Sequence, residues 1–167
     1  SDPNDTYEYI LTDTCTTKNV GVIFDRNKTG RFTLVPPMQY GVQYYIAYGV
    51  GDSLPNGQLK LQNNKCLGLA WQPVIFYKCP TAKCPAPDTI YCSLQSSLKA
   101  QPSVGVGKWT VLSKPANSVV TIGNPNASGT SLKVSEYGDY AFQWLEDNEG
   151  YRDSCSTSVK FIYIPAP

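Results

Sequence analysis

Short stretches of alternating apolar residues dominate the second half of the chain and constrain its fold more than any other feature. In GDYAFQW the side chains of Tyr140, Phe142 and Trp144 lie two residues apart, so an extended chain places them on one face. The same spacing recurs in GKWTV, SLKV and SVKFIYI. No stretch sustains the i, i+3, i+4 spacing of an amphipathic helix. Turn-forming Gly, Asn, Ser and Pro separate the segments, which is typical of an antiparallel β-sandwich.

The first half carries a similar series of β-prone segments. They are YEYILT, NVGVIFD, RFTLVP, YGVQYYIAYGVG, QLKLQ and NNKCLGLAWQPVIFYKCP. Pro36 and Pro37 end RFTLVP because neither can donate a ladder hydrogen bond. The segment PTAKCPAPD then favours an extended, stiff connector. We therefore expect an all-β chain with a sandwich at residues 1–80, a proline-rich linker at 81–88 and a second sandwich at 89–167.

Composition excludes several classes of function. The formal net charge of +1 leaves no basic excess to neutralise phosphates, which argues against nucleic acid as a partner. Histidine is absent, so Ser–His–Asp and Cys–His catalysis and histidine-ligated metals are excluded. No apolar run reaches the length of a membrane span. Six cysteines indicate an oxidising compartment, and we expect a secreted or extracellular surface protein.

Cysteine, glycine and aromatic residues follow a fixed order in the second half. The order is Cys92, Gly107 with Trp109, Gly138 with Tyr140, Phe142 and Trp144, and then Cys155. It resembles the immunoglobulin-like repeats of large bacterial surface proteins, especially gliding-adhesin-like proteins. The first half is similar to a preceding repeat, through GRFTLVPPMQYGVQYYIAYGVG and NNKCLGLAWQPVIFYKCP. The resemblance implies two tandem immunoglobulin-like sandwiches, and the segment CPTAKC departs from its pattern.

The domain division suggests how the cysteines pair into disulfides. The expected pairs are Cys92 with Cys155, Cys15 with Cys66, and Cys79 with Cys84. In an alternative arrangement, Cys79 or Cys84 is paired across the domain boundary. The C-x4-C spacing of Cys79 and Cys84 is also half of a zinc site, but without histidine that site needs two more of the scattered cysteines. We expect disulfide staples and neither a metal nor another cofactor.

Three N-x-S/T sequons are candidate glycosylation sites. They begin at Asn4, Asn27 and Asn126, and all lie in predicted turns or at the terminus, where a glycan fits. A chain rich in Asn, Ser and Thr also acquires such sequons by chance. Asn27 is the first choice if the source is eukaryotic, and in a bacterial source the sequons carry no meaning.

Four acidic residues gather in the predicted hairpin loop between the last two strands. They are Glu146, Asp147, Glu149 and Asp153. Carboxylate oxygens in such loops can hold calcium, but no D-x-D-x-D-G pattern fixes the geometry, so a solvated polar loop is favoured. Glycoside hydrolysis requires two carboxylates facing each other in a cleft, and nothing in the sequence places such a pair. We expect no enzymatic activity.

The expected function is structural or adhesive: part of a surface stalk, filament or matrix. The expected partners are other copies of the chain or cell-surface and matrix proteins. The terminal segments YEYILT and FIYIPAP are β-prone, so one of them could insert into a neighbour's sheet edge, although ordinary edge strands are favoured. The alternative function is a carbohydrate- or receptor-binding module, in which exposed Tyr and Trp, including the tyrosines of YGVQYYIAYG, stack on the ligand.

Overall fold

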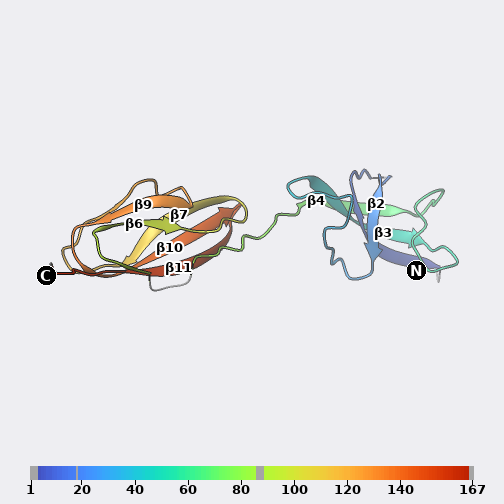
Figure 1. The fold of residues 1–167 in the computed structure, drawn as a ribbon. Helices are drawn as coiled ribbons and strands as arrows, with labels where there is room; N and C mark the ends of the chain where they lie inside the picture. The colour runs from blue at the N-terminus through green and yellow to red at the C-terminus, as the bar shows by residue number, and fades with distance from the viewer. Residues whose placement is uncertain (1–3, 18, 86–88, 166–167) are drawn as a thin grey trace. The chain divides into compact units, whose positions relative to one another are not determined.

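The computed structural model describes residues 4–17, 19–85 and 89–165, and these residues form strands, turns and loops but no helix (Figure 1). The all-β prediction is confirmed. Within the described residues no helix is long and apolar enough to cross a membrane. The chain divides into two compact units, Ser1–Tyr77 and Lys78–Pro167. The division falls just before the proline-rich segment, which groups with the second unit.

The first unit contains one four-stranded antiparallel sheet in the order β2-β1-β3-β4. Its strands are β1 (Asp5–Thr12), β2 (Ile23–Asn27), β3 (Gln43–Asp52) and β4 (Gly68–Ile75). β1 pairs with β2 on one side and with β3 on the other. The segment YEYILT is therefore an inner strand of its own sheet and is not available for insertion into a neighbour.

Irregular chain covers part of each face of this sheet. Ile10 and Leu11 are neighbours on β1 with no exposed surface, and successive strand residues point to opposite faces. Ile10 packs with Leu59, whereas Leu11 packs with Met38 and Tyr44. The covering side chains come from residues 28–42 on one face and 53–67 on the other.

The expected first sandwich is not confirmed, because among the described residues only one sheet forms in this unit. The segments RFTLVP and QLKLQ were expected as strands, but they contribute to the cores as irregular chain. Phe32 and Leu34 still pack against the buried cluster of Leu11, Met38 and Tyr44. Their alternation therefore reflects burial against the sheet and not hydrogen bonding to a neighbouring strand. Pro36 and Pro37 lack the N–H groups that would extend a ladder from this segment.

The second unit contains two sheets. The four-stranded sheet has the order β5-β11-β10-β7, and the three-stranded sheet has the order β6-β9-β8. The strands are β5 (Thr89–Tyr91), β6 (Gln95–Lys99), β7 (Val106–Ser113), β8 (Val120–Ile122), β9 (Gly129–Val134), β10 (Gly138–Asn148) and β11 (Tyr151–Phe161). β10 and β11 form a long hairpin (Figure 1). β5 pairs with β11 in parallel.

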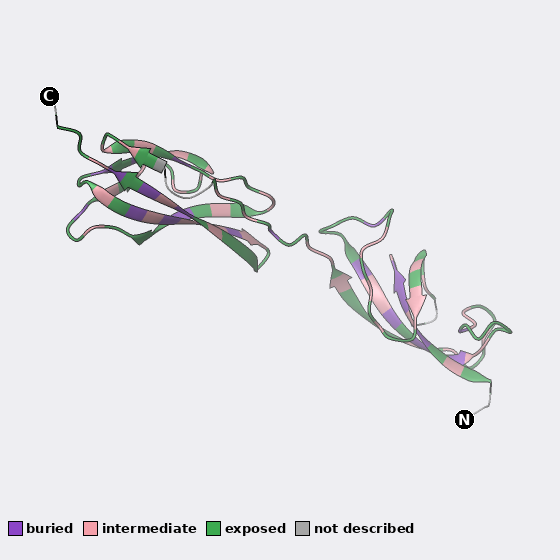
Figure 2. Cartoon of the chain, turned by 60° about the horizontal axis from the view of Figure 1, so that its bottom comes forward, coloured by how far each residue is buried: buried purple, intermediate pink, exposed green. Residues whose placement is uncertain are grey.

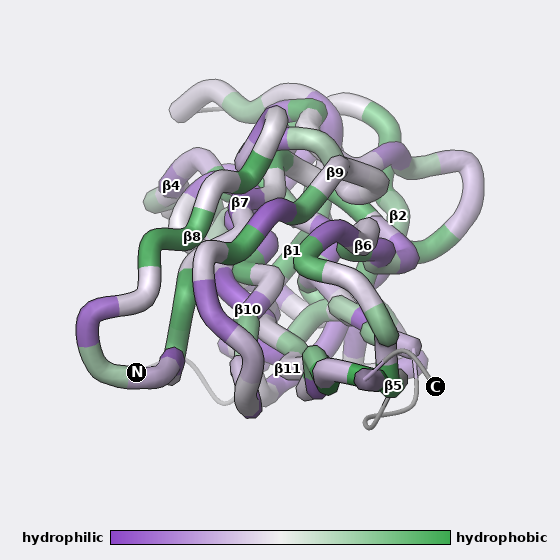
Figure 3. The backbone as a smooth tube through the Cα atoms, turned by 60° about the vertical axis from the view of Figure 1, so that its left-hand side comes forward, coloured by the Kyte–Doolittle hydropathy of each residue, from purple (hydrophilic) through white to green (hydrophobic). Residues whose placement is uncertain are grey.

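One core lies between these two sheets. Tyr140, Phe142 and Trp144 are 1%, 0% and 2% exposed, which confirms that they share a buried face. The opposite sheet contributes Leu98 and Leu132 to the same cluster. Buried positions alternate with intermediate ones along β10 and with exposed ones near the end of β9 (Figure 2). Figure 3 colours the backbone by hydropathy and shows short hydrophobic and hydrophilic stretches following one another along the chain.

Candidate functional site

Three tyrosines on β1 and β3 form an aromatic row on one face of the first unit, called here the tyrosine row. Tyr9 lies directly opposite Tyr48 in the antiparallel register, and Tyr7 lies two residues before Tyr9 on the same face. The ring centroids are 5.0 Å apart for Tyr9 and Tyr48 and 5.9 Å apart for Tyr7 and Tyr48. Tyr7 is 45% exposed and Tyr48 is 38% exposed. The row therefore offers partly open aromatic faces to a ligand.

Lys28, in the turn after β2, lies beside Tyr7 at one end of the tyrosine row. Its Nζ is 4.9 Å from the centroid of the Tyr7 ring. It donates to Thr6 Oγ1 at 2.7 Å and to the backbone oxygen of Tyr7. An ammonium group has three donors, so one remains for a ligand. No described residue hydrogen-bonds to a hydroxyl of the row, and these hydroxyls too are free to bind.

The sequence predicted the alternation of these tyrosines but not the row itself. In the sequence, Tyr7 and Tyr9 are two residues apart and so share one face of an extended strand, whereas Tyr48 belongs to a different β-prone segment. Their meeting depends on the pairing of β1 with β3, which joins residues about forty positions apart. Nothing in the sequence indicated that Lys28 lies beside these tyrosines, because lysine is common in turns.

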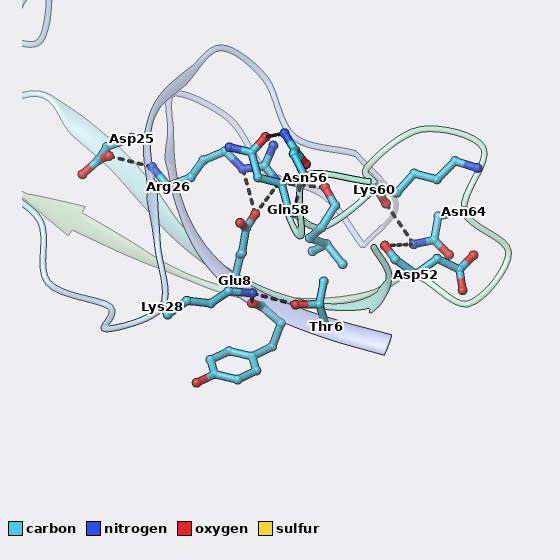
Figure 4. A network of polar contacts seen from close by, with 12 residues as sticks. Thr6, Glu8, Asp25, Arg26, Lys28, Asp52, Asn56, Gln58, Lys60 and Asn64 are labelled. Carbon is cyan, nitrogen blue, oxygen red and sulfur yellow. Dashed lines mark hydrogen bonds and ion pairs between the residues drawn. The ribbon is translucent and has the colours of Figure 1, made fainter. Parts of the chain in front are cut away.

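The opposite face of β1 carries a buried ion pair (Figure 4). Arg26 Nε donates to Glu8 Oε2 at 2.8 Å, and Arg26 Nη2 donates to the same oxygen and, at 2.7 Å, to the carbonyl of Leu59. Glu8 is only 5% exposed. Its charge is therefore balanced inside the unit, and the pair fastens the loop that contains Leu59 to the sheet.

The four acidic residues of the predicted loop do not converge on one point. Glu146 is 1% exposed and accepts hydrogen bonds from Trp144 Nε1 at 3.0 Å and from Ser103 Oγ at 2.6 Å. Burial acts to raise the pKa of Glu146, but the hydrogen bonds from Ser103 and Trp144 outweigh it and hold the pKa below its ordinary value. This carboxylate is a structural group in the core and not a loop ligand.

The other three acids have separate surroundings. Asp147 accepts a hydrogen bond from Arg152 Nε at 2.5 Å, which lowers the pKa of its carboxyl group. Asp153 accepts one from the backbone N–H of Ala82 at 2.8 Å, and Glu149 lies in the turn between β10 and β11. Among the described residues no group of three or more His, Cys, Asp or Glu side chains could hold a metal ion.

The cysteine pairing differs from the expected one. Cys84 is bonded to Cys155, with their Cα atoms 5.5 Å apart, so the expected Cys92–Cys155 and Cys79–Cys84 pairs are wrong. β5 runs parallel to β11 with Tyr91 opposite Phe161, which places Cys92 about 23 Å along the strand from Cys155. Cys84 and Cys155 both belong to the second unit, so the observed bond joins the proline-rich segment to β11 within that unit and is not a pair across the domain boundary.

The remaining cysteines are free thiols, so the expected Cys15–Cys66 bond is also absent from the described residues. They are Cys15, Cys66, Cys79 and Cys92. Cys15 is partly buried and packs against the Ile10 cluster. Burial raises the pKa of the Cys15 thiol, which favours the unreactive protonated form.

The three sequons lie in different surroundings. The side chain of Asn27 is occupied by its own turn: Oδ1 accepts from Gly30 N at 2.7 Å, and Nδ2 donates to the Arg31 carbonyl at 2.9 Å. Asn4 is exposed just before β1. Asn126 is exposed on the edge of a hollow of about 590 Å³, and no described residue bonds its side-chain amide. Glycosylation at all three stays a prediction.

Comparison of the sequence with protein-family models gives no match, and comparison with curated protein sequences gives none either. Function must therefore be inferred from the folds of the two units and from the geometry of their surfaces.

Proposed function

We propose that the chain is an extracellular structural or adhesive module whose second unit is an immunoglobulin-like sandwich. The hydroxyl of Tyr140, near the start of β10, donates to the carbonyl of Glu136 at 2.8 Å. This contact resembles the tyrosine corner found in such sandwiches and supports the proposal. Trp109 on β7 is buried against Trp144, with ring centroids 5.4 Å apart, as expected of the tryptophan in that fold.

The likeness to bacterial surface repeats supports the same proposal for the second unit. The glycine and aromatic positions of its motif fall on β7 and β10 and fill the core. The disulfide departs from the motif because it uses Cys84 in place of Cys92. We restrict the immunoglobulin-like proposal to this unit, since the first unit is built on a single sheet.

The first and last strands of the second unit, β5 and β11, pair in parallel, and this observation supports a mechanical role for the unit. Thr89 lies opposite Val159 and Tyr91 opposite Phe161, and Ile162 N donates to the Tyr91 carbonyl at 2.9 Å. Because the strands are parallel, the chain enters at one end of the pair and leaves at the other. When the Cys84–Cys155 bond is reduced, tension slides the strands along each other and loads their hydrogen bonds together.

Immunogold electron microscopy of the source cells tests this function. An antibody against the chain should label stalks, fibres or matrix outside the cell. Label confined to the cell interior, or to free molecules in the medium, would contradict the structural role. A disulfide joining two distant parts of the chain fits the extracellular location.

A second function, binding of carbohydrate, is favoured by the tyrosine row. Its open rings can stack on the C–H face of a sugar, while the phenol hydroxyls and Lys28 bond the sugar hydroxyls. A glycan array should then report binding, and Tyr48→Ala should weaken it about tenfold. Tyr40→Ala is the matched control, because Tyr40 is 54% exposed in the same unit but lies outside the row. Absence of binding to any glycan would rule out this second function.

A further inference from the structure

We propose that the Cys84–Cys155 disulfide carries tension past the core of the second unit. The inference rests on the proposed load-bearing function. The bond joins the segment that enters the unit to the last strand, across a sequence separation of 71 residues. The strands β5 to β10 all belong to the chain loop that this bond closes. A pull that reaches Cys84 therefore has a covalent route to β11 that avoids them.

Hydrogen bonds hold the segment that enters the second unit, residues 81–84, against β11 and the loop after β6. Ala82 N donates to the Asp153 carboxylate on β11 at 2.8 Å. Thr81 N donates to Ser103 Oγ at 2.7 Å, and Gln101 N donates to the Lys83 carbonyl at 2.8 Å. These contacts place Cys84 beside the middle of β11, and the disulfide fixes it there. Tension on Lys78 and its neighbours is thus delivered to Cys155.

From Cys155 the load follows a strand that is already extended. Residues 155–161 complete β11 and pair with β10, from Cys155 opposite Trp144 to Phe161 opposite Gly138. A β-strand rises about 3.3 Å per residue, close to the limit of a stretched chain, so it has little length to release. The loop between the two cysteines bears none of the pull. With the bond intact, the second unit acts as a link of fixed length.

Without the bond the same pull takes a different course. Tension passes through the whole loop and draws β5 and β11 past each other along their parallel pairing. Once these strands separate, the chain between Cys84 and Cys155 can extend. The sequence separation of 71 residues corresponds to a gain in length of about 240 Å.

Single-molecule force spectroscopy on the full chain, held at its two ends, tests the proposal. The oxidised chain should give one unfolding event, from the first unit. With a phosphine reductant, a second event of about 240 Å should follow. In that reaction the phosphine gives two electrons to the disulfide, and one water molecule supplies the two protons of the thiols and the oxygen of the phosphine oxide. Cys84→Ser should show the second event without reductant, and Cys92→Ser, which removes an exposed free thiol, should behave like the wild type.

Three results would overturn the proposal. The first is peptide mapping of the oxidised chain that pairs Cys155 with a cysteine other than Cys84. The second is a reduced chain that shows no second event. The third is a reduced chain that gains the length without a force peak, which would mean that the bond maintains the fold and does not relieve a folded core of load. The reductant experiment on the wild type decides the matter if Cys84→Ser does not fold. None of these results bears on the immunogold labelling, so the adhesive function is tested separately.

Discussion

The indole Nε1 of Trp144 donates a 3.0 Å hydrogen bond to Oε1 of Glu146, two residues further along the same strand. The opposite carboxylate oxygen accepts from Ser103 Oγ at 2.6 Å, and Ser103 N lies 3.1 Å and 3.2 Å from the two oxygens. A charged group is thereby kept in the core beside the largest aromatic side chain. Through Ser103, the Glu146 carboxylate joins β10 to the loop after β6. The segment that enters the second unit is bonded to the same loop, because Thr81 N donates to Ser103 Oγ.

Glu146→Gln should destabilise the second unit. The amide NH₂ replaces one acceptor oxygen, so it cannot satisfy all the donors from Ser103 and Trp144. The expected loss in the free energy of unfolding is about 1–3 kcal/mol. Urea unfolding followed by tryptophan fluorescence measures it. Glu149→Gln makes the same change at an exposed turn position and should leave the midpoint unchanged. Equal midpoints for the two variants would contradict this role of Glu146.

The same carboxyl group should make stability depend on acid pH. Hydrogen bonds from Ser103 and Trp144 keep the pKa of Glu146 below its ordinary value in the folded chain. The unfolded chain, with a glutamate pKa of about 4.3, then binds protons more readily. The stabilisation is therefore complete above that pH and is lost as the pH falls through the lower folded pKa. Urea midpoints between pH 7 and pH 2 should fall less steeply for Glu146→Gln than for the wild type.

Gly107→Ala should also destabilise the second unit, because Trp144 covers the space where a side chain would begin. A Cβ at Gly107 would lie 1.9 Å from Cζ2 of the Trp144 ring, which is fixed in the core. The expected cost is about 1–3 kcal/mol. Gly129→Ala is the matched control in another strand, since a Cβ there has no atom within 4 Å. Thermal unfolding followed by circular dichroism should separate the two variants clearly.

The two arginine ion pairs should differ in their effect on stability. Arg26→Met leaves the Glu8 carboxylate buried without its partner, which should cost the first unit about 3–5 kcal/mol. Arg152→Met removes the partner of Asp147, where the two side chains are 67% and 31% exposed, and should cost less than about 1 kcal/mol. Denaturant unfolding of both variants measures the difference. Similar losses would mean that the Glu8 pair is effectively solvated.

The sequence was informative where the signal is local. Alternation over a few residues placed Tyr140, Phe142 and Trp144 on one buried face, and the structure agrees. It could not reveal which segments meet. The three-residue parallel pairing of β5 with β11 has no sequence signature, yet it decides which cysteine reaches Cys155. In the first half, Phe32 and Leu34 alternate without forming a strand, because apolar loop residues can cover a sheet with the same spacing.

For the candidate sites, too, the sequence did not reveal which residues lie close together in space. The acidic residues 146–153 are close in sequence, but the hairpin turns Glu146 into the core and leaves its neighbours elsewhere. The tyrosine row joins residues far apart in sequence, and only the register of β1 with β3 brings them together. Proximity along the chain was thus a poor guide to proximity in space for both sites.

The position of β1 between β2 and β3 bears on how the first unit is made. During synthesis β2 leaves the ribosome soon after β1, and the two can form a hairpin at once. Ile10 and Leu11 point to opposite faces, and the side chains that cover them arrive later, from β3 and from the flanking segments near Met38 and Leu59. Until residues 43–59 have emerged, the nascent hairpin exposes apolar surface on both sides, and this is the interval in which a chaperone would bind it.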